Sequence, residues 1–279
     1  MNVEEYINNA RNLLEQDKID DAIKMYEKSL ELANNSGNTK VYADVCLEFG
    51  TLLVNLENYE DAEKLFKEAY KHYKNLNIKN DLANSMYNLA LALYNLGKYD
   101  EALKYISEAE ALFKDVGSAD GYADAIYVKA LIYSALGDYD KALATFKETL
   151  NAYKKVGNVD AMISVYIDMA NMAVDAEEEK DAITYLKKAK ELAIKKGDPA
   201  TIGDVMVAYG EIYEALEKYP KACESFLDAA ENYANAGMPE LAKEYLGRVD
   251  SLLDELPKAT QKRIRNRLWD LEDALEKKK

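Results

Sequence analysis

The chain has 279 residues, of which 51 are acidic and 36 basic, so its formal net charge is −15 at pH 7. This surplus of negative charge disfavours nucleic acid as a partner, because phosphates are repelled, and favours a basic protein surface or peptide. No segment approaches the roughly 18 consecutive apolar residues of a membrane span, and the N-terminus lacks the pattern of a secretory signal, so we expect a cytoplasmic protein without membrane insertion.

Alanine recurs every 40 residues between positions 22 and 222, and a small residue lies twelve positions before each of these alanines. The alanines are Ala22, Ala62, Ala102, Ala142, Ala182 and Ala222, and the earlier small residues are Ala10, Gly50, Ala90, Ala130, Ala170 and Gly210. Self-similarity at a fixed period of roughly 20 to 50 residues is typical of a solenoid. The period therefore predicts one supersecondary unit stacked six times.

Turn residues divide each unit into two helices. Gly97 and Gly137 mark a turn within two of the units. At the end of every unit stands a residue that tolerates a left-handed backbone, and helix N-caps or prolines follow it. These end residues are Gly37, Asn77, Gly117, Gly157, Gly197 and Gly237, and the following start signals include Asn38, Ser118, Asn158, Asp198, Pro199 and Pro239.

Large apolar residues at fixed positions predict the core of each helical hairpin. On the first helices they are Tyr6, Cys46, Met86, Ile126, Tyr166 and Met206, and on the second helices Tyr26, Phe66, Ile106, Phe146, Leu186 and Phe226. The spacing from Asn84 to Ala109 resembles the tetratricopeptide repeat (TPR), with Met86, Leu89, Ala90, Leu93, Ala102, Ile106 and Ala109 at its apolar and small positions. The resemblance implies an all-α, right-handed superhelical α-solenoid of TPR-like helical hairpins.

The 40-residue period exceeds the usual TPR period of roughly 34 residues. Each helix is therefore expected to be about three residues longer than usual, or roughly 4 to 5 Å. The longer unit resembles the repeats of kinesin light chains, cell-polarity adaptors and bacterial peptide-sensing regulators. That resemblance implies binding of peptides or proteins along a concave groove.

Residues 1–237 are thus predicted to form six TPR-like hairpins and residues 238–279 a C-terminal capping helix pair. Basic residues crowd the start of the last helix, from Lys258 to Arg267. A capping role is favoured for this pair. The alternative is a basic arm that docks on the acidic body of the same or another molecule, with Trp269 as an anchor, so self-association through the C-terminal helices stays open.

Chemical motifs are missing from the sequence. His72 is the only histidine and occupies a packing position, and Cys46 and Cys223 fall in apolar series, which predicts buried thiols. No Cys/His cluster has metal-binding spacing, and neither a phosphate-binding loop nor a nucleophile elbow occurs. We therefore expect no enzyme activity, no catalytic residue, no metal and no cofactor.

A second set of positions on the first helices predicts a binding surface. Its apolar centre lies at Leu47, Tyr87, Tyr127 and Ile167, and acidic residues precede it by three positions. An apolar floor with an acidic rim suits a basic, amphipathic peptide or protein segment. The candidate partner-binding residues are Asp44, Leu47, Tyr87, Leu91, Tyr94, Asp124, Tyr127, Leu131, Ile167 and Asp204.

Alternative interpretations remain open at this point. The same residues could pack against each other or against the C-terminal pair, in which case they are core rather than groove. A membrane-fusion or complex-assembly adaptor similar to the soluble NSF attachment proteins and a peptide-sensing regulatory protein are the two competing functions, both by fold-level analogy. A non-enzymatic protein-interaction scaffold is the function that the sequence favours.

Overall fold

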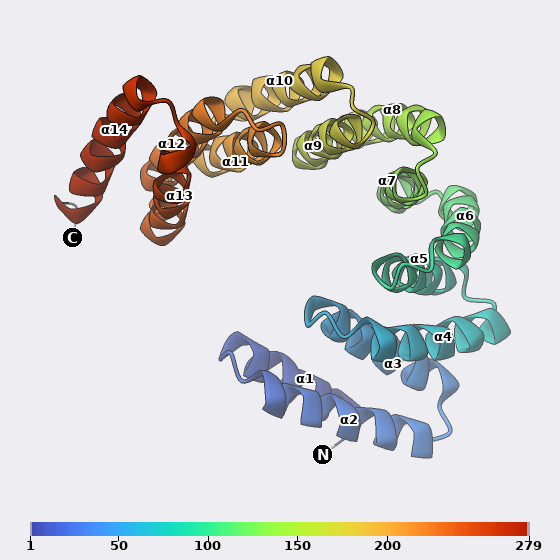
Figure 1. Ribbon diagram of the computed structural model, residues 1–279. Helices are drawn as coiled ribbons and strands as arrows, with labels where there is room; N and C mark the ends of the chain where they lie inside the picture. Colours follow the sequence, from blue (N-terminus) through green and yellow to red (C-terminus); the bar gives the residue numbers. More distant parts are fainter. Residues whose placement is uncertain (1, 278–279) are drawn as a thin grey trace. The chain divides into compact units, whose positions relative to one another are not determined.

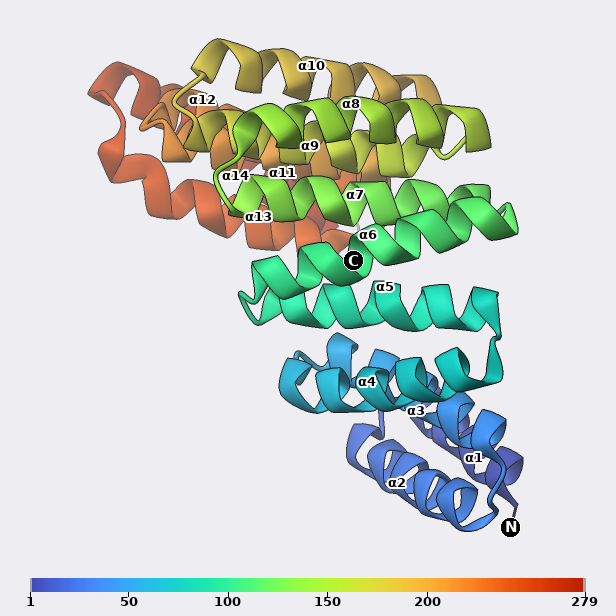
Figure 2. The same cartoon turned by 90° about the vertical axis from the view of Figure 1, so that its right-hand side faces the viewer.

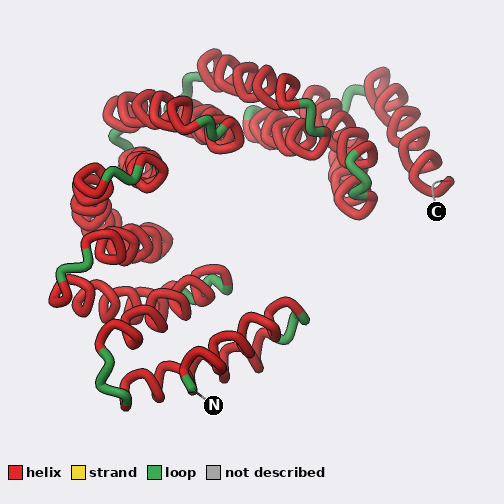
Figure 3. Tube along the Cα trace, turned by 180° about the vertical axis from the view of Figure 1, so that it is seen from behind, coloured by secondary structure: helices red, strands yellow, loops and turns green. Residues whose placement is uncertain are grey.

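The computed structural model describes residues 2–277 (Figure 1). Within this range the chain forms fourteen α-helices and a short 3-10 turn, with no strand. Figure 3 shows the same chain as helices joined by short loops. The helices are α1 (Val3–Glu15), α2 (Ile19–Asn35), α3 (Thr39–Asn55), α4 (Tyr59–Leu76), α5 (Lys79–Asn95), α6 (Tyr99–Val116), α7 (Ala119–Ala135), α8 (Tyr139–Val156), α9 (Val159–Asp175), α10 (Glu179–Lys196), α11 (Pro199–Ala215), α12 (Tyr219–Asn235), α13 (Pro239–Leu252) and α14 (Lys258–Lys277), with the 3-10 turn at Leu253–Glu255.

Successive helices pair as antiparallel hairpins, so the predicted all-α solenoid of TPR-like hairpins is confirmed. Figure 2 shows α5 and α6 side by side as one such hairpin. The chain divides into two compact units, residues 1–152 and 153–279. Each unit has its own hydrophobic core, built from the small and large residues of its hairpins.

The expected turns between hairpins are present at every predicted position. Gly37, Gly117, Gly157, Gly197 and Gly237 have φ between 69° and 77°, and Asn77 has φ of 54°. The side chains of four predicted N-caps each accept a hydrogen bond from a backbone N–H of the following helix: Asn38, Ser118, Asn158 and Asp198. The boundaries between hairpins were therefore readable from the sequence.

The small residue of the first helix receives a large ring from the second. An added Cβ on Gly50 would lie 2.6 Å from Cε1 of Phe66, and one on Gly210 would lie 2.3 Å from Cε1 of Phe226. Both rings are almost completely buried. Glycine at these two positions lets the helix backbone lie directly against the aromatic face.

Lys129, which departs from the apolar pattern of its helix, has a specific partner. Its Nζ donates to Oε2 of Glu110 on α6 at 2.8 Å, and both side chains are 23% exposed. The charge is thus matched where it is half-buried, as such a position requires.

The C-terminal helices pack within the second unit, where α14 contacts both α12 and α13 (Figure 1). Ile264, Leu268 and Leu275 are buried in this contact. Arg263 pairs with Glu224 of α12, and Arg267 donates to Asp228 of α12 at 2.7 Å. Part of the basic run therefore docks on the acidic surface of its own unit.

Candidate functional site

The candidate surface is formed by the first helices of the hairpins. In the first unit α3 contacts α5 and α5 contacts α7, and in the second unit α9 contacts α11. Because first helices neighbour each other from one hairpin to the next, residues at equivalent positions line up across the unit. Three pockets lined by residues 2–277 are described below, two in the first unit and one in the second.

The first pocket lies between α1 and α3 and has a volume of about 670 Å³. Val3, Ile7, Val41 and Val45 provide its apolar lining. Polar side chains surround them: Asn2, Glu4, Asn8, Arg11, Ser36, Asn38 and Asp44. Apolar contact area with convergent polar groups is the usual character of a ligand pocket.

The second pocket, of about 570 Å³, extends along α3 to α5. Leu14, Leu47 and Leu52 line it with apolar surface, and Asp44, Glu48 and Asp81 contribute carboxylates. Asn84 and Asn88 lie one helical turn apart on α5 and face the same pocket. Neither amide has a hydrogen-bond partner among residues 2–277, so both are available to a ligand.

An ion pair between successive hairpins separates the two pockets. Arg11 donates through Nε and Nη2 to the two carboxylate oxygens of Glu48, each at 2.8 Å. The hydroxyl of Tyr26 donates to the same carboxylate at 2.7 Å. Burial, together with this hydrogen bond to Glu48, raises the pKa of Tyr26.

Two acidic residues of the predicted rim are partly engaged inside their own hairpins. Tyr73 Oη donates to Asp44 at 2.7 Å, and Tyr233 Oη donates to Asp204 at 2.8 Å. Lys40 also donates to Asp44, at 2.9 Å. The sequence shows the same pairing: each unit with a tyrosine 29 residues after the rim position has aspartate at the rim. The unit with Phe113 in place of that tyrosine has Asn84 in place of the aspartate. The rim therefore has a structural role besides any role in binding.

The structure places the predicted apolar patch on α5 and α7 of the first unit. Tyr87, Leu91 and Tyr94 are half-buried and rest on the core of that unit, and Leu131 on α7 is half-buried. The ring of Tyr87 meets Phe113 edge-on at 6.5 Å, and Tyr127 lies 6.5 Å from Phe146. Burial, followed by the charge of Asp124, raises the pKa of Tyr87 to about 12. These rings are thus anchored on one side by the second helices.

The remaining predicted residues are divided between the described pockets and the second unit. Asp44 and Leu47 line one pocket together. Asp124 is half-exposed on α7. Ile167 is half-buried on α9 against the core of the second unit, and Asp204 is exposed on α11.

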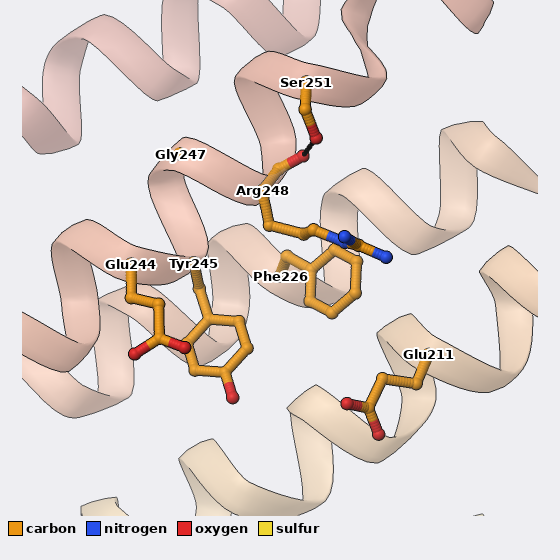
Figure 4. A pocket seen from close by; sticks show the side chains of 7 residues that line it. All are labelled: Glu211, Phe226, Glu244, Tyr245, Gly247, Arg248 and Ser251. Atoms are coloured by element: carbon orange, nitrogen blue, oxygen red, sulfur yellow. Dashed lines mark hydrogen bonds between the residues drawn. The ribbon is translucent and has the colours of Figure 1, made fainter.

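One pocket of the second unit has a volume of about 530 Å³ and lies between α11 and α13 (Figure 4). Its lining comprises Glu211, Phe226, Glu244, Tyr245, Gly247, Arg248 and Ser251. Tyr245 stacks on Phe226 at 5.9 Å and on Tyr233 at 5.7 Å. The pocket therefore has an aromatic wall.

Charged groups of α11 and α13 face one another at this pocket. Arg248 donates to both carboxylate oxygens of Glu214, at 2.7 and 3.2 Å. Burial raises the pKa of Glu211, Arg248 opposes this rise, and Glu214 adds to it. As with Arg11 and Glu48, the ion pair joins first helices of neighbouring hairpins.

Several pocket residues were missed in the sequence. Glu48 and Asn88 occupy equivalent positions, one residue after the apolar centre of the surface, and Arg248 lies at the same position of the period four 40-residue steps after Asn88. A polar residue recurring beside an apolar series was the signal that could have identified them. Lys40, Asp81 and Tyr245 gave no comparable signal, because exposed charges and aromatic core residues occur throughout the chain.

The cysteine and histidine side chains are packed against other residues of the fold. Burial raises the pKa of Cys46 to about 12 and that of Cys223 to about 11, and both thiols are buried as expected. His72 packs edge-on against Tyr42 at 5.3 Å. Among residues 2–277 no group of three or more His, Cys, Asp or Glu side chains is arranged to hold a metal ion. No helix in that range is long and apolar enough to cross a membrane.

A family model described as tetratricopeptide repeat matches residues 5–75 and 81–155, which together make up just over half of the chain. A comparison with curated protein sequences found no match.

Solved structures share the fold at low sequence identity. Aspartyl phosphate phosphatase F from Bacillus subtilis is 14% identical with a TM-score of 0.65, over 88% of this chain and 69% of that one. The Rap conjugation gene regulator of the plasmid pLS20, solved in complex with the Phr peptide, is 17% identical with a TM-score of 0.56, over 94% and 75%. A putative kinesin light chain from Podospora anserina with nearly identical TPR-like repeats is 12% identical with a TM-score of 0.61, over 70% and 96%.

Proposed function

The chain belongs to the tetratricopeptide repeat family, and we propose that it is a non-enzymatic scaffold that binds a basic, amphipathic peptide or protein segment on its first helices. The pocket along α3 and α5 is the observation that carries this proposal. The structural similarity to a regulator solved in complex with a peptide supports peptide binding as the general mode.

The lining of that pocket matches the three parts of such a ligand. Leu14, Leu47 and Leu52 would receive its apolar side chains. The amides of Asn84 and Asn88 each donate and accept, so they can pair with the backbone of an extended segment. Carboxylates at the margin would attract its lysine or arginine side chains.

The half-buried patch on α5 and α7 would extend the surface. Leu91, which packs against the core of the first unit, and Leu131 are its half-buried aliphatic members. Tyr87 and Tyr127 lie against second-helix rings and would contribute one exposed side each. The similarity to a protein named as a phosphatase shows a shared fold at 14% identity and adds no catalytic role to the proposal.

The experiment measures binding of two labelled model peptides by fluorescence anisotropy. One alternates leucine with lysine and the other leucine with glutamate, and we expect at least a tenfold tighter binding of the lysine peptide. Leu47→Ser combined with Asp81→Lys should weaken that binding at least tenfold, because one change removes apolar contact and the other reverses a margin charge. Leu91→Ser with Leu131→Ser tests the extension in the same assay.

The matched control is Leu65→Ser, a half-buried leucine on the second helix α4 that lines none of the described pockets. It loses a similar apolar side chain and should leave peptide affinity unchanged. Circular dichroism must show native helicity for every variant. Equal binding of both peptides, or equal loss of binding in Leu65→Ser, would contradict the proposed groove.

A further inference from the structure

One face of α14 is exposed along its whole length. Residues Lys258, Lys262, Arg265, Trp269, Glu272 and Glu276 follow one another at alternating steps of four and three, and all six are exposed. Steps of four and three keep side chains on one side of a helix and form the seam through which two helices pair. The seam is therefore a continuous surface about 30 Å long at 1.5 Å per residue.

The face of α14 that carries Ile264, Leu268 and Leu275 is already occupied within the second unit. Ile264, Leu268 and Leu275 are buried, and Arg263 and Arg267 pair with carboxylates of α12. In contrast, Lys262, Arg265, Glu272 and Glu276 have no ion-pair partner within residues 2–277.

Trp269 lies at the middle of this seam and is the only tryptophan in the chain. Its exposed fraction is 65%, larger than that of any other exposed large apolar side chain in residues 2–277. A large aromatic side chain within a charged surface is typical of an interface anchor.

The order of basic and acidic residues along the seam indicates that its partner is a second copy of the same helix. The seam is basic before Trp269 and acidic after it, so two copies laid antiparallel around Trp269 bring Lys262 opposite Glu276 and Arg265 opposite Glu272. We propose that two copies of the chain associate through α14 in this antiparallel arrangement, with the two Trp269 rings in contact at the two-fold axis. A two-fold interface requires such self-complementarity.

Other occupants fit this surface less well. A parallel pair would set like charges against each other, and an acidic segment or an anionic membrane would be repelled by Glu272 and Glu276. A cavity of about 440 Å³ between α13 and α14, lined by Lys243, Leu246, Glu272, Leu275 and Glu276, adjoins the acidic half of the seam. It gives the lysine of the second copy room beside those carboxylates.

The interface is small, because it consists of one exposed helix face from each copy. Interfaces below roughly 1,200 Å² are generally weak, so association is expected only at high protein concentration, on the order of 100 μM for a Kd that corresponds to about −5.5 kcal/mol. Sedimentation velocity of the full chain across a concentration range around that value should show conversion from monomer to dimer. Over the same range the fluorescence of Trp269 should shift to shorter wavelength as the ring leaves water.

Charge reversal gives a sharper test. Lys262→Glu with Arg265→Glu makes all four opposing charges of the seam acidic, and Glu272→Lys with Glu276→Lys makes all four basic. Each variant alone should stay monomeric at the concentrations at which the original chain dimerises, because like charges then oppose each other. An equimolar mixture of the two should form a dimer at least as tight as the original, because every opposing pair is then complementary.

A control variant, Lys154→Glu with Lys155→Glu, reverses two exposed lysines at the end of α8 and should leave association unchanged. Circular dichroism establishes that each variant is folded. The proposal is overturned by a monomer at every concentration, by dimerisation of either seam variant alone, or by a mixture that fails to associate. Binding of the monomer to anionic phosphatidylserine vesicles in place of dimerisation would overturn it as well.

Discussion

At the scale of single residues, the turns inside the hairpins have a left-handed backbone conformation that the residue type does not always predict. Gly97 and Gly137 adopt the left-handed conformation there, but Asp17, Glu57, Glu177 and Glu217 adopt it too, with φ between 55° and 61°. A residue with a Cβ has a cost of about 1–2 kcal/mol in this region. Four of the six hairpins therefore contain a strained turn residue.

Glu177→Gly should raise stability, because glycine removes the steric cost at φ of 61°. Its greater freedom in the unfolded chain reduces the gain, so we expect about 0.5–1 kcal/mol, or a rise in Tm of about 1–4 °C. Thermal melting monitored by circular dichroism measures the change. Glu178→Gly is the control, since Glu178 has φ of −95° and no such cost to remove. Equal or lower stability of Glu177→Gly relative to the original chain would refute the strain argument.

At the scale of helices, each hairpin is held together by a small residue on one helix and a large residue on the other. The pair of residues differs between hairpins. Gly50 packs against Phe66, whereas the corresponding pair in the next hairpin is Ala90 and Ile106. Ala130 has Phe146 at the corresponding position. An alanine can therefore also pack against a ring where the neighbouring helices leave space for its Cβ. The pair, rather than either residue, is what the fold requires.

Gly50→Ala should destabilise the chain by about 1–3 kcal/mol, because the new Cβ would lie 2.6 Å from the buried Phe66 ring. Adding Phe66→Ile recreates the pair of the next hairpin and should recover most of the loss. Chemical denaturation of the single and double variants measures both effects. Additive losses in the double variant would show that the two residues do not share one packing site.

The fold could be predicted because its signals are local and repeat six times. The left-handed caps and the small and aromatic core positions all follow from residue types at fixed spacing. The turns at Asp17, Glu57, Glu177 and Glu217 could not be predicted, because few non-glycine residues adopt the left-handed conformation and residue type does not distinguish these acidic residues from the others in the chain. The candidate site was harder, since a rim aspartate such as Asp44 looks the same in sequence whether it faces a ligand or a tyrosine hydroxyl.

At the scale of the whole molecule, tyrosine carries much of the packing. The chain has 22 tyrosines and only one tryptophan. Burial raises the pKa of Tyr73 and Tyr233, and their hydrogen bonds to Asp44 and Asp204 raise it further. Burial also raises the pKa of Tyr87 and of Tyr209 to about 12.

These shifts predict loss of stability at alkaline pH. Below about pH 10 the tyrosines are protonated in both the folded and the unfolded chain, so their ionisation does not change the free energy of unfolding. Above that value the unfolded chain releases protons that the folded chain retains, and stability falls as pH rises toward 12 and beyond. Thermal melts between pH 8 and pH 11.5 should give a shallow fall in Tm from about pH 9, because the unfolded chain ionises Cys46 and Cys223 while their buried thiols stay protonated, and a steep decline above roughly pH 10. Tyrosinate absorbance that develops fully while the helices remain intact would contradict this prediction.

The matching left-handed turns after each hairpin have a consequence for how such a chain changes in length. A cut between Gly37 and Asn38 and another between Asn77 and Ile78 release one complete hairpin, and joining the ends restores the same kind of turn. Because each hairpin packs mainly on its neighbours, loss or duplication of a 40-residue segment preserves the rest of a unit. The proposed binding surface can therefore lengthen or shorten in steps of one first helix, so the span of the segment that it would bind can change by gene duplication as well as by point mutation.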